Sequence, residues 1–145
     1  MRALVQRVKE ARVTANDDTV GAIDRGILIF LGIAKGDTRA QAEWLAKKVC
    51  HLRIFEDETG KFNLSLKDIG GSALIVSQFT LYGDCQKGRR PSFDKAASPE
   101  DARQLYEAFI TFVKQEGIPV ATGEFGALMQ VYLINDGPVT LLVEK

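Results

Sequence analysis

The sequence is poor in the residues that metal sites and disulfide frameworks require. Its 145 residues include one histidine, His51, and two cysteines, Cys50 and Cys85, which lie far apart in no zinc-binding pattern. We therefore expect neither a metal nor another cofactor. The first residues, MRALVQRVKEARV, alternate apolar and charged side chains and do not predict a signal peptide. Both cysteines are then expected to be free thiols in a reducing cytoplasm.

The chain also lacks net charge. It has 19 basic and 19 acidic residues, a balance that gives no support for a broad basic surface for nucleic acid. The best local cluster is CQKGRRP, where Lys87, Arg89 and Arg90 stand close together; its ordinary interpretation is a solvated loop. No apolar run is long enough to span a membrane. A hydrophobic content of 46% predicts one globular domain over residues 1–145.

Short apolar runs separated by turn residues predict several strands. The continuous run Ile27–Ile33 predicts a central strand that is covered on both faces, and Ala73–Val76 predicts a second apolar strand. Asn16-Asp17-Asp18 predicts the turn of a hairpin within residues 11–23. Further strands are expected at residues 3–8, around a turn at 58–60, and at 119–122, 129–134 and 139–143.

Two segments have the periodicity of amphipathic helices. Asp37 or Thr38 can cap the first, whose apolar face is expected to carry Ala42, Leu45, Ala46, Val49 and Leu52. The second begins at Ser98-Pro99-Glu100-Asp101 and ends at Gly117. Two helices cannot cover both faces of about eight strands. We therefore expect an α/β fold of three layers, with two stacked β-sheets and both helices on one outer face.

The residues alone indicate little chemistry. Ser77, Thr80 and Thr140 are possible nucleophiles, but no base stands near them in the sequence. There is no glycine-rich phosphate loop and no serine nucleophile elbow. His51 falls at the expected end of a helix, where a structural role is natural.

The C-terminal segment contains an unusual turn sequence. Two apolar runs flank Asn135-Asp136-Gly137-Pro138, and Asp-Gly between such runs is typical of a hairpin. A proline directly after that turn removes a hydrogen-bond donor from the start of the returning strand. Either the turn is merely rigid, or the loop holds an unusual backbone shape for a purpose.

Two motifs resemble a known family. SQFTLYGD, at residues 77–84, and NDGPVT, at residues 135–140, resemble the signature motifs of D-aminoacyl-tRNA deacylase, and the likeness extends to MRALVQRV and ATGEFGALM. The resemblance implies hydrolysis of the ester that joins a D-amino acid, or glycine mischarged on tRNA(Ala), to the 3′ end of tRNA. It also implies a homodimer that needs no membrane.

The resemblance implies that Gly137-Pro138 is a cis peptide that reaches across the dimer interface into the partner's active site. Cis X-Pro bonds are only about 5–6% of X-Pro bonds in folded proteins, so one usually has a reason. Carbonyl oxygens pointing the same way would form a wall against the α-carbon of the aminoacyl group, and an L side chain would clash with it. Val139 and Thr140 would adjoin this substrate-binding loop.

The family also implies roles for the first motif. The missing base suggests that the terminal ribose 2′-hydroxyl, or a water that it positions, assists the reaction. Backbone N–H groups of Phe79 and Thr80 would stabilise the oxyanion, Gln78 would orient the substrate, and Ser77 would shape the site. A side-chain role for Thr80 or Thr140 stays open.

Three further predictions have ordinary alternatives. Arg7 braces the Gly-Pro loop, or is a surface arginine of a strand. Phe125 and Met129 pack on the terminal adenine, or belong to the core. The basic cluster at residues 87–90 contacts tRNA phosphates, or is simply solvated.

Two other functions compete with the hydrolase. One is a non-catalytic binder of tRNA ends, and the other is a Ser/Thr-dependent hydrolase of small D-amino-acid esters. Replacing the terminal 2′-hydroxyl by hydrogen would stop substrate-assisted hydrolysis but would affect a side-chain nucleophile much less.

Overall fold

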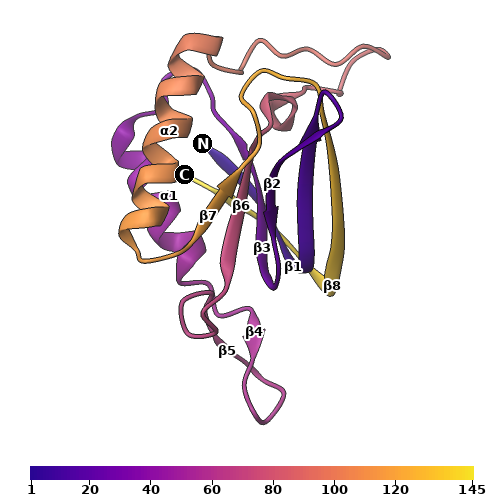
Figure 1. Ribbon diagram of the computed structural model, residues 1–145. Coiled ribbons are helices and arrows are strands. Elements are labelled where there is room, and N and C mark those ends of the chain that lie inside the picture. Colours follow the sequence, from indigo (N-terminus) through magenta and orange to yellow (C-terminus); the bar gives the residue numbers. More distant parts are fainter.

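A computed structural model describes residues 1–145 and consists of eight strands, two α-helices and a 3₁₀ helix (Figure 1). In chain order these are β1 (Arg2–Ala15), β2 (Asp18–Ile23), β3 (Gly26–Gly32), α1 (Arg39–Cys50), β4 (Phe55–Glu56), β5 (Phe62–Leu64), β6 (Ser72–Ser77), η1 (Phe79–Tyr82), α2 (Pro99–Gln115), β7 (Val120–Thr122) and β8 (Met129–Glu144).

The predicted three-layer α/β arrangement is confirmed, with both helices on one side of the strands (Figure 1). The two β-layers are joined, however, because six strands form one hydrogen-bonded sheet in the order β2-β1-β3-β6-β7, with β8 also paired to β1. The long strand β1 makes this possible, since β3 pairs with its residues 2–8 and β2 with its residues 11–15. The sheet therefore bends over itself, and β4 and β5 form a separate small hairpin.

Two apolar cores separate the three layers. Alternate side chains of β3 point to opposite sides, so that Ile27 and Ile29 face the helices while Leu28 joins the second core between the β-layers. This alternation confirms that the run 27–33 is covered on both faces. The second core consists of Val8, Ala11, Val13, Ile23, Leu28, Leu74 and Val76.

Both helices begin where their capping residues predict. Thr38 rather than Asp37 caps α1, in a reciprocal capping box with Gln41. Ser98 caps α2, with Pro99 in the first turn, and Gly117 follows its end at a φ of +82°. The placement of Leu52 on the face of α1 was wrong, because the helix ends at Cys50; Leu52 packs against the core from beyond it.

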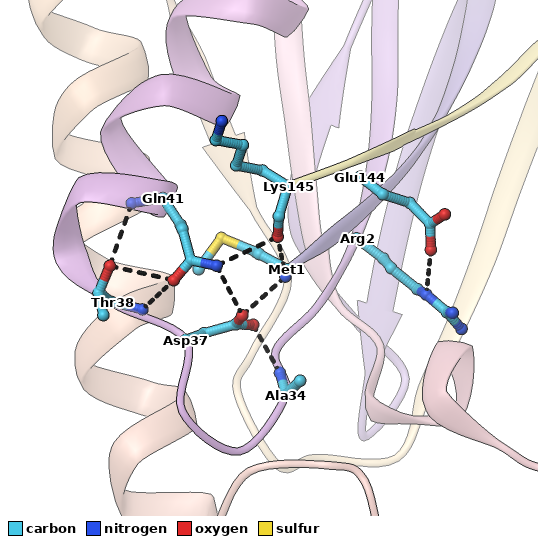
Figure 2. A network of polar contacts seen from close by, with 8 residues as sticks. All are labelled: Met1, Arg2, Ala34, Asp37, Thr38, Gln41, Glu144 and Lys145. Carbon is cyan, nitrogen blue, oxygen red and sulfur yellow. Dashed lines mark hydrogen bonds and ion pairs between the residues drawn. The ribbon is translucent and has the colours of Figure 1, made fainter.

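Asp37 has a different task, which joins both chain ends to α1 (Figure 2). Its carboxylate pairs with the Met1 ammonium at 2.8 Å and accepts a hydrogen bond from the Ala34 N–H at 2.7 Å. The Met1 ammonium also donates to the Lys145 carbonyl at 2.7 Å, and the Gln41 side chain reaches the same carbonyl at 3.3 Å. The first and last strands are thereby held against the start of α1.

Of the two alternatives for Asn135–Pro138, the ordinary hairpin turn is wrong. Strand β8 continues in one direction along β1, with Asn135 opposite Val8 and Thr140 opposite Gln6. The residues between them outnumber those on β1, so the segment 136–139 bulges out opposite Arg7. Proline fits a bulge because it needs no partner for its missing N–H.

Candidate active site

The carboxyl end of β6 opens into a cavity of about 540 Å³. Its walls come from the ends of β3 and β6, the start of α2, and the segment between β7 and β8. None of the lining residues carries a charge: Leu31, Ile33, Val76, Ser77, Gln78, Phe79, Ala97, Pro99, Ala102, Phe125, Gly126, Ala127, Leu128, Met129 and Val131. An apolar cavity with a few polar groups is typical of a small-molecule site.

The SQFT segment turns sharply at this cavity. Strand β6 runs parallel to β3 up to Ser77, and the Gln78 N–H still donates to the Leu31 carbonyl at 2.8 Å. The chain then enters η1, so Phe79 and Thr80 are its first two residues. The first N–H groups of a helix have no acceptor inside that helix. Both are therefore suited to receive an oxyanion.

No base activates the hydroxyl groups of this segment. The Thr80 hydroxyl accepts a hydrogen bond from the Gln78 side-chain amide, which is not a base at neutral pH. Ser77, Gln78 and Phe79 line the cavity. Thr80 is not in the lining but is hydrogen-bonded to Gln78, which is. The lining contains no histidine, lysine or carboxylate that could remove a proton.

Phe125 and Met129 also line the cavity, and each contacts a core. Phe125 packs against the helix-side core, with its ring centroid 5.7 Å from that of Tyr106. Met129 packs against the second core, and a Cβ on Gly123 would lie 2.7 Å from its sulfur. The two alternatives for these residues are thus compatible, since the side chains can fill the core on one side and the cavity on the other.

The Gly-Pro loop interrupts β8 near its middle, at the bend that Figure 1 shows far from the segment joining β7 to β8. The peptide bond Gly137-Pro138 is cis, and both residues are exposed. Val139 is buried in the core, whereas the Thr140 hydroxyl accepts a hydrogen bond from the Gln6 side chain at 3.2 Å. The exposed pair therefore stands out from an anchored strand.

Arg7 lies directly behind this loop and is only 5% exposed. Its Nε donates to the Asp136 carbonyl at 2.9 Å and lies 3.2 Å from the carboxylate of the same residue. A second nitrogen donates to the Ile54 carbonyl at 2.6 Å. The Asn135 side-chain amide bridges the bulge, donating to the Arg7 carbonyl at 2.9 Å and to the Val139 carbonyl at 3.1 Å.

The predicted site residues thus form two groups within one chain. Ser77, Gln78 and Phe79 line the cavity together with Phe125 and Met129, with Thr80 adjoining, while Arg7 contacts Asp136 near the middle of β8. Residues of the cavity that the sequence did not indicate include Leu31, Ala97, Pro99 and Val131. Of these, the sequence could have indicated only Leu31, because a parallel pairing of the two apolar strands places it beside Ser77.

The remaining reactive side chains lie elsewhere. His51 pairs with Glu116 at 2.8 Å and so links the ends of the two helices. Both cysteines are free, and burial raises the pKa of the Cys50 thiol to about 12. No helix has the length and apolar character needed to cross a membrane.

Comparison with known proteins agrees with these motifs. Residues 4–144 match the profile of a family described as D-Tyr-tRNA(Tyr) deacylase. The chain belongs to this family. It is 61% identical to a D-aminoacyl-tRNA deacylase of Desulfatibacillum aliphaticivorans, over 100% of this chain and 99% of that protein. It is 58% identical to a D-aminoacyl-tRNA deacylase of Thermotoga petrophila, over 100% and 97% of the two chains.

Two solved structures have the same fold. The first, titled c-Myc DNA Unwinding Element Binding Protein, has a TM-score of 0.94 at 42% identity and covers 100% of this chain and 99% of its own. The second, a probable eukaryotic D-amino acid tRNA deacylase, has a TM-score of 0.84 at 20% identity, with 98% and 97% covered. The predictions of the family, of an enzyme and of an α/β fold are confirmed.

Proposed function

We propose that this protein hydrolyses the ester bond of D-aminoacyl-tRNA and releases the free D-amino acid and tRNA. Membership of the deacylase family supports this activity. The observation that carries the proposal is the cavity at the end of β6, which has no charged side chain in its lining and lies beside the first residues of η1. An aminoacyl ester is already reactive, so positioning and oxyanion stabilisation suffice for its hydrolysis.

The reaction is assisted by the substrate in this proposal. The terminal 2′-hydroxyl orients a water that attacks the ester carbonyl, and the N–H groups of Phe79 and Thr80 stabilise the oxyanion. The intermediate then expels the ribose 3′-oxygen, which takes up the proton that the attacking water gives up and leaves as the free tRNA end. A well-aimed oxyanion donor contributes roughly 3 kcal/mol. Gln78, held by its hydrogen bond to Thr80, orients the aminoacyl group.

A homodimer belongs to the same proposal, because the two groups of site residues lie apart in one chain. The outer edge of β8 has no strand partner, and Tyr132, Ile134, Leu141 and Leu142 are exposed along this strand. An open, apolar strand edge is suited to pairing with a second copy. Such pairing would carry the exposed Gly137-Pro138 of one chain toward the cavity of the other.

The Gly-Pro loop then rejects L-aminoacyl groups. Arg7 and Asn135 hold the bulge from behind, which makes its backbone a firm wall. A side chain of L configuration would collide with that wall, whereas a D-residue or glycine directs only hydrogen toward it. The same reasoning admits glycyl-tRNA mischarged on tRNA(Ala). A cytoplasmic location follows from the substrate, since aminoacyl-tRNA is made and used there.

The proposal is tested by timing the loss of D-tyrosyl-tRNA and L-tyrosyl-tRNA in parallel. We expect fast loss of the D ester alone. Loss of both esters would support hydrolysis but contradict the rejection of L-aminoacyl groups by the Gly-Pro loop. Loss of neither, with tRNA still bound, would favour a non-catalytic binder of tRNA ends.

A further inference from the structure

The segment between η1 and α2, residues 83–97, is built as a projecting arm. Its base is closed by Asp84 and Ser92, whose backbone groups exchange hydrogen bonds at 2.7 and 3.0 Å. The Asp84 carboxylate also accepts a hydrogen bond from the Gln86 N–H at 3.0 Å. The arm returns to the body through the Ala97 N–H, which donates to the Ile33 carbonyl at 2.9 Å.

The tip of this arm carries three cations without partners. Lys87, Arg89 and Arg90 are exposed, and none of them makes an ion pair or stacks on an aromatic ring. The acidic residues of the arm are engaged near its base. The Asp84 carboxylate lies 4.0 Å from the Lys95 ammonium, and Asp94 accepts a hydrogen bond from the Ser92 hydroxyl at 2.8 Å. The charge at the tip is therefore not neutralised within the chain.

The arm is continuous with the wall of the cavity. The Phe93 ring packs edge-on against the Phe79 ring, with centroids 5.0 Å apart, and Phe79 lines the cavity. Ala97, the last residue of the arm, lines the cavity as well. Figure 1 shows the arm leaving the body beside η1, at the same end as the segment that joins β7 to β8.

The cavity itself has no cationic side chain that could bind a nucleic-acid phosphate. None of its lining residues is charged, and the formal net charge of the chain is zero. Nucleic acids nevertheless bind proteins mainly through contacts between phosphates and cations. Two arginines at this end are already engaged: Arg103 lies 4.9 Å from the Phe125 ring centroid, and Arg2 pairs with Glu144.

We infer that Lys87, Arg89 and Arg90 bind phosphate groups of the tRNA acceptor stem while the 3′ end of the same tRNA occupies the cavity. This inference rests on the proposed function. Arginine suits the task because its guanidinium binds phosphate oxygens in pairs. The arm is thus a contact for the RNA backbone that supplies affinity without reading the aminoacyl group.

The test compares the variant Lys87→Gln/Arg89→Gln/Arg90→Gln with the control Lys48→Gln/Lys67→Gln/Lys114→Gln. The control removes the same charge from exposed lysines that make no ion pair and lie outside the arm. Binding of uncharged tRNA is measured by fluorescence anisotropy between about 50 and about 200 mM salt. Hydrolysis is measured on D-tyrosyl-tRNA and on a short D-tyrosyl ester of the CCA trinucleotide, which lacks the stem.

We expect the arm variant to raise the Kd for tRNA about 10- to 100-fold at low salt. The slope of log Kd against log salt concentration should also fall, by an amount that corresponds to about two to three lost phosphate contacts. The KM for D-tyrosyl-tRNA should rise in parallel, with hydrolysis of the short ester unchanged. The control should match the natural protein in every measurement.

An equal loss of tRNA binding in both variants, or a Kd changed by less than about threefold in the arm variant, would overturn the inference. So would a matching loss of activity on the short ester, which would place the arm in the cavity wall. Because uncharged tRNA needs no hydrolysis, the measurement of tRNA binding decides the inference even if the natural protein cleaves neither ester. That last result would defeat the proposed function alone.

Discussion

The start of β8 and its middle belong to two regions built on opposite principles. The start of the strand joins the wall of a cavity that has no charged side chain and lies beside the first residues of η1. In the middle of the strand, a buried arginine and an asparagine amide hold an exposed backbone segment from behind. In the proposed function, the N–H groups beside the cavity stabilise the oxyanion, and the loop in β8 rejects L-aminoacyl groups. Chemistry and selection are then assigned to separate parts of the chain.

The largest effect should come from the substrate rather than the protein. D-Tyrosyl-tRNA ending in 2′-deoxyadenosine should be hydrolysed at least about a thousand-fold more slowly, because the cavity has no base to replace the 2′-hydroxyl. Single-turnover rates with both substrates measure this, and tRNA binding is the control. A loss of less than about tenfold would point to a side-chain nucleophile instead.

Arg7→Ala should cost the most stability. It leaves the Ile54 and Asp136 carbonyl groups without their donor, at a cost of about 3 kcal/mol in the free energy of unfolding. Urea denaturation measures the loss. Arg12→Ala is the matched control on the same strand, since Arg12 is exposed and only stacks on Tyr132; it should cost less than about 1 kcal/mol. Equal costs would show that Arg7 is an ordinary strand arginine.

Asn135→Ala should loosen the wall while leaving the cavity intact. It removes two hydrogen bonds that span the bulge, and we expect a loss of about 1–2 kcal/mol in stability. The ratio of D to L hydrolysis rates should fall about tenfold, with the rate on the D ester little changed. Gln130→Ala, in the same strand, serves as the control. Slower hydrolysis of the D ester with an unchanged ratio of D to L rates would contradict the assignment of selection to the loop and of chemistry to the cavity.

The smallest effects should come from the hydroxyl groups beside the cavity. Ser77→Ala and Thr80→Ala should each lower kcat by less than about tenfold, because no base activates either hydroxyl. Thr80→Ser, which retains the partner of Gln78, is the control for the lost hydrogen bond. A fall of about a thousand-fold with normal tRNA binding would make that hydroxyl the nucleophile.

Local signals in the sequence were sufficient wherever neighbours along the chain satisfy one another. Ser98 and Pro99 start α2, Thr38 starts α1, and Asn16 and Asp17 turn the first hairpin with positive φ values. These features depend on hydrogen bonds and dihedral preferences within a few residues. The alternation of buried side chains in β3 belongs to the same class.

Tertiary structure decided what depends on distant partners. Asp136-Gly137 has the sequence of a hairpin turn, but pairing with β1 on both sides carries the strand onward and turns the segment into a bulge. Arg7 is buried because the Ile54 and Asp136 carbonyl groups, far away in the sequence, converge on it. The motifs at residues 77–80 and 135–140 were visible in the sequence. Their positions at opposite ends of one bent sheet follow only from the tertiary structure. The long strand β1 determines them, because it pairs with strands of both β-layers.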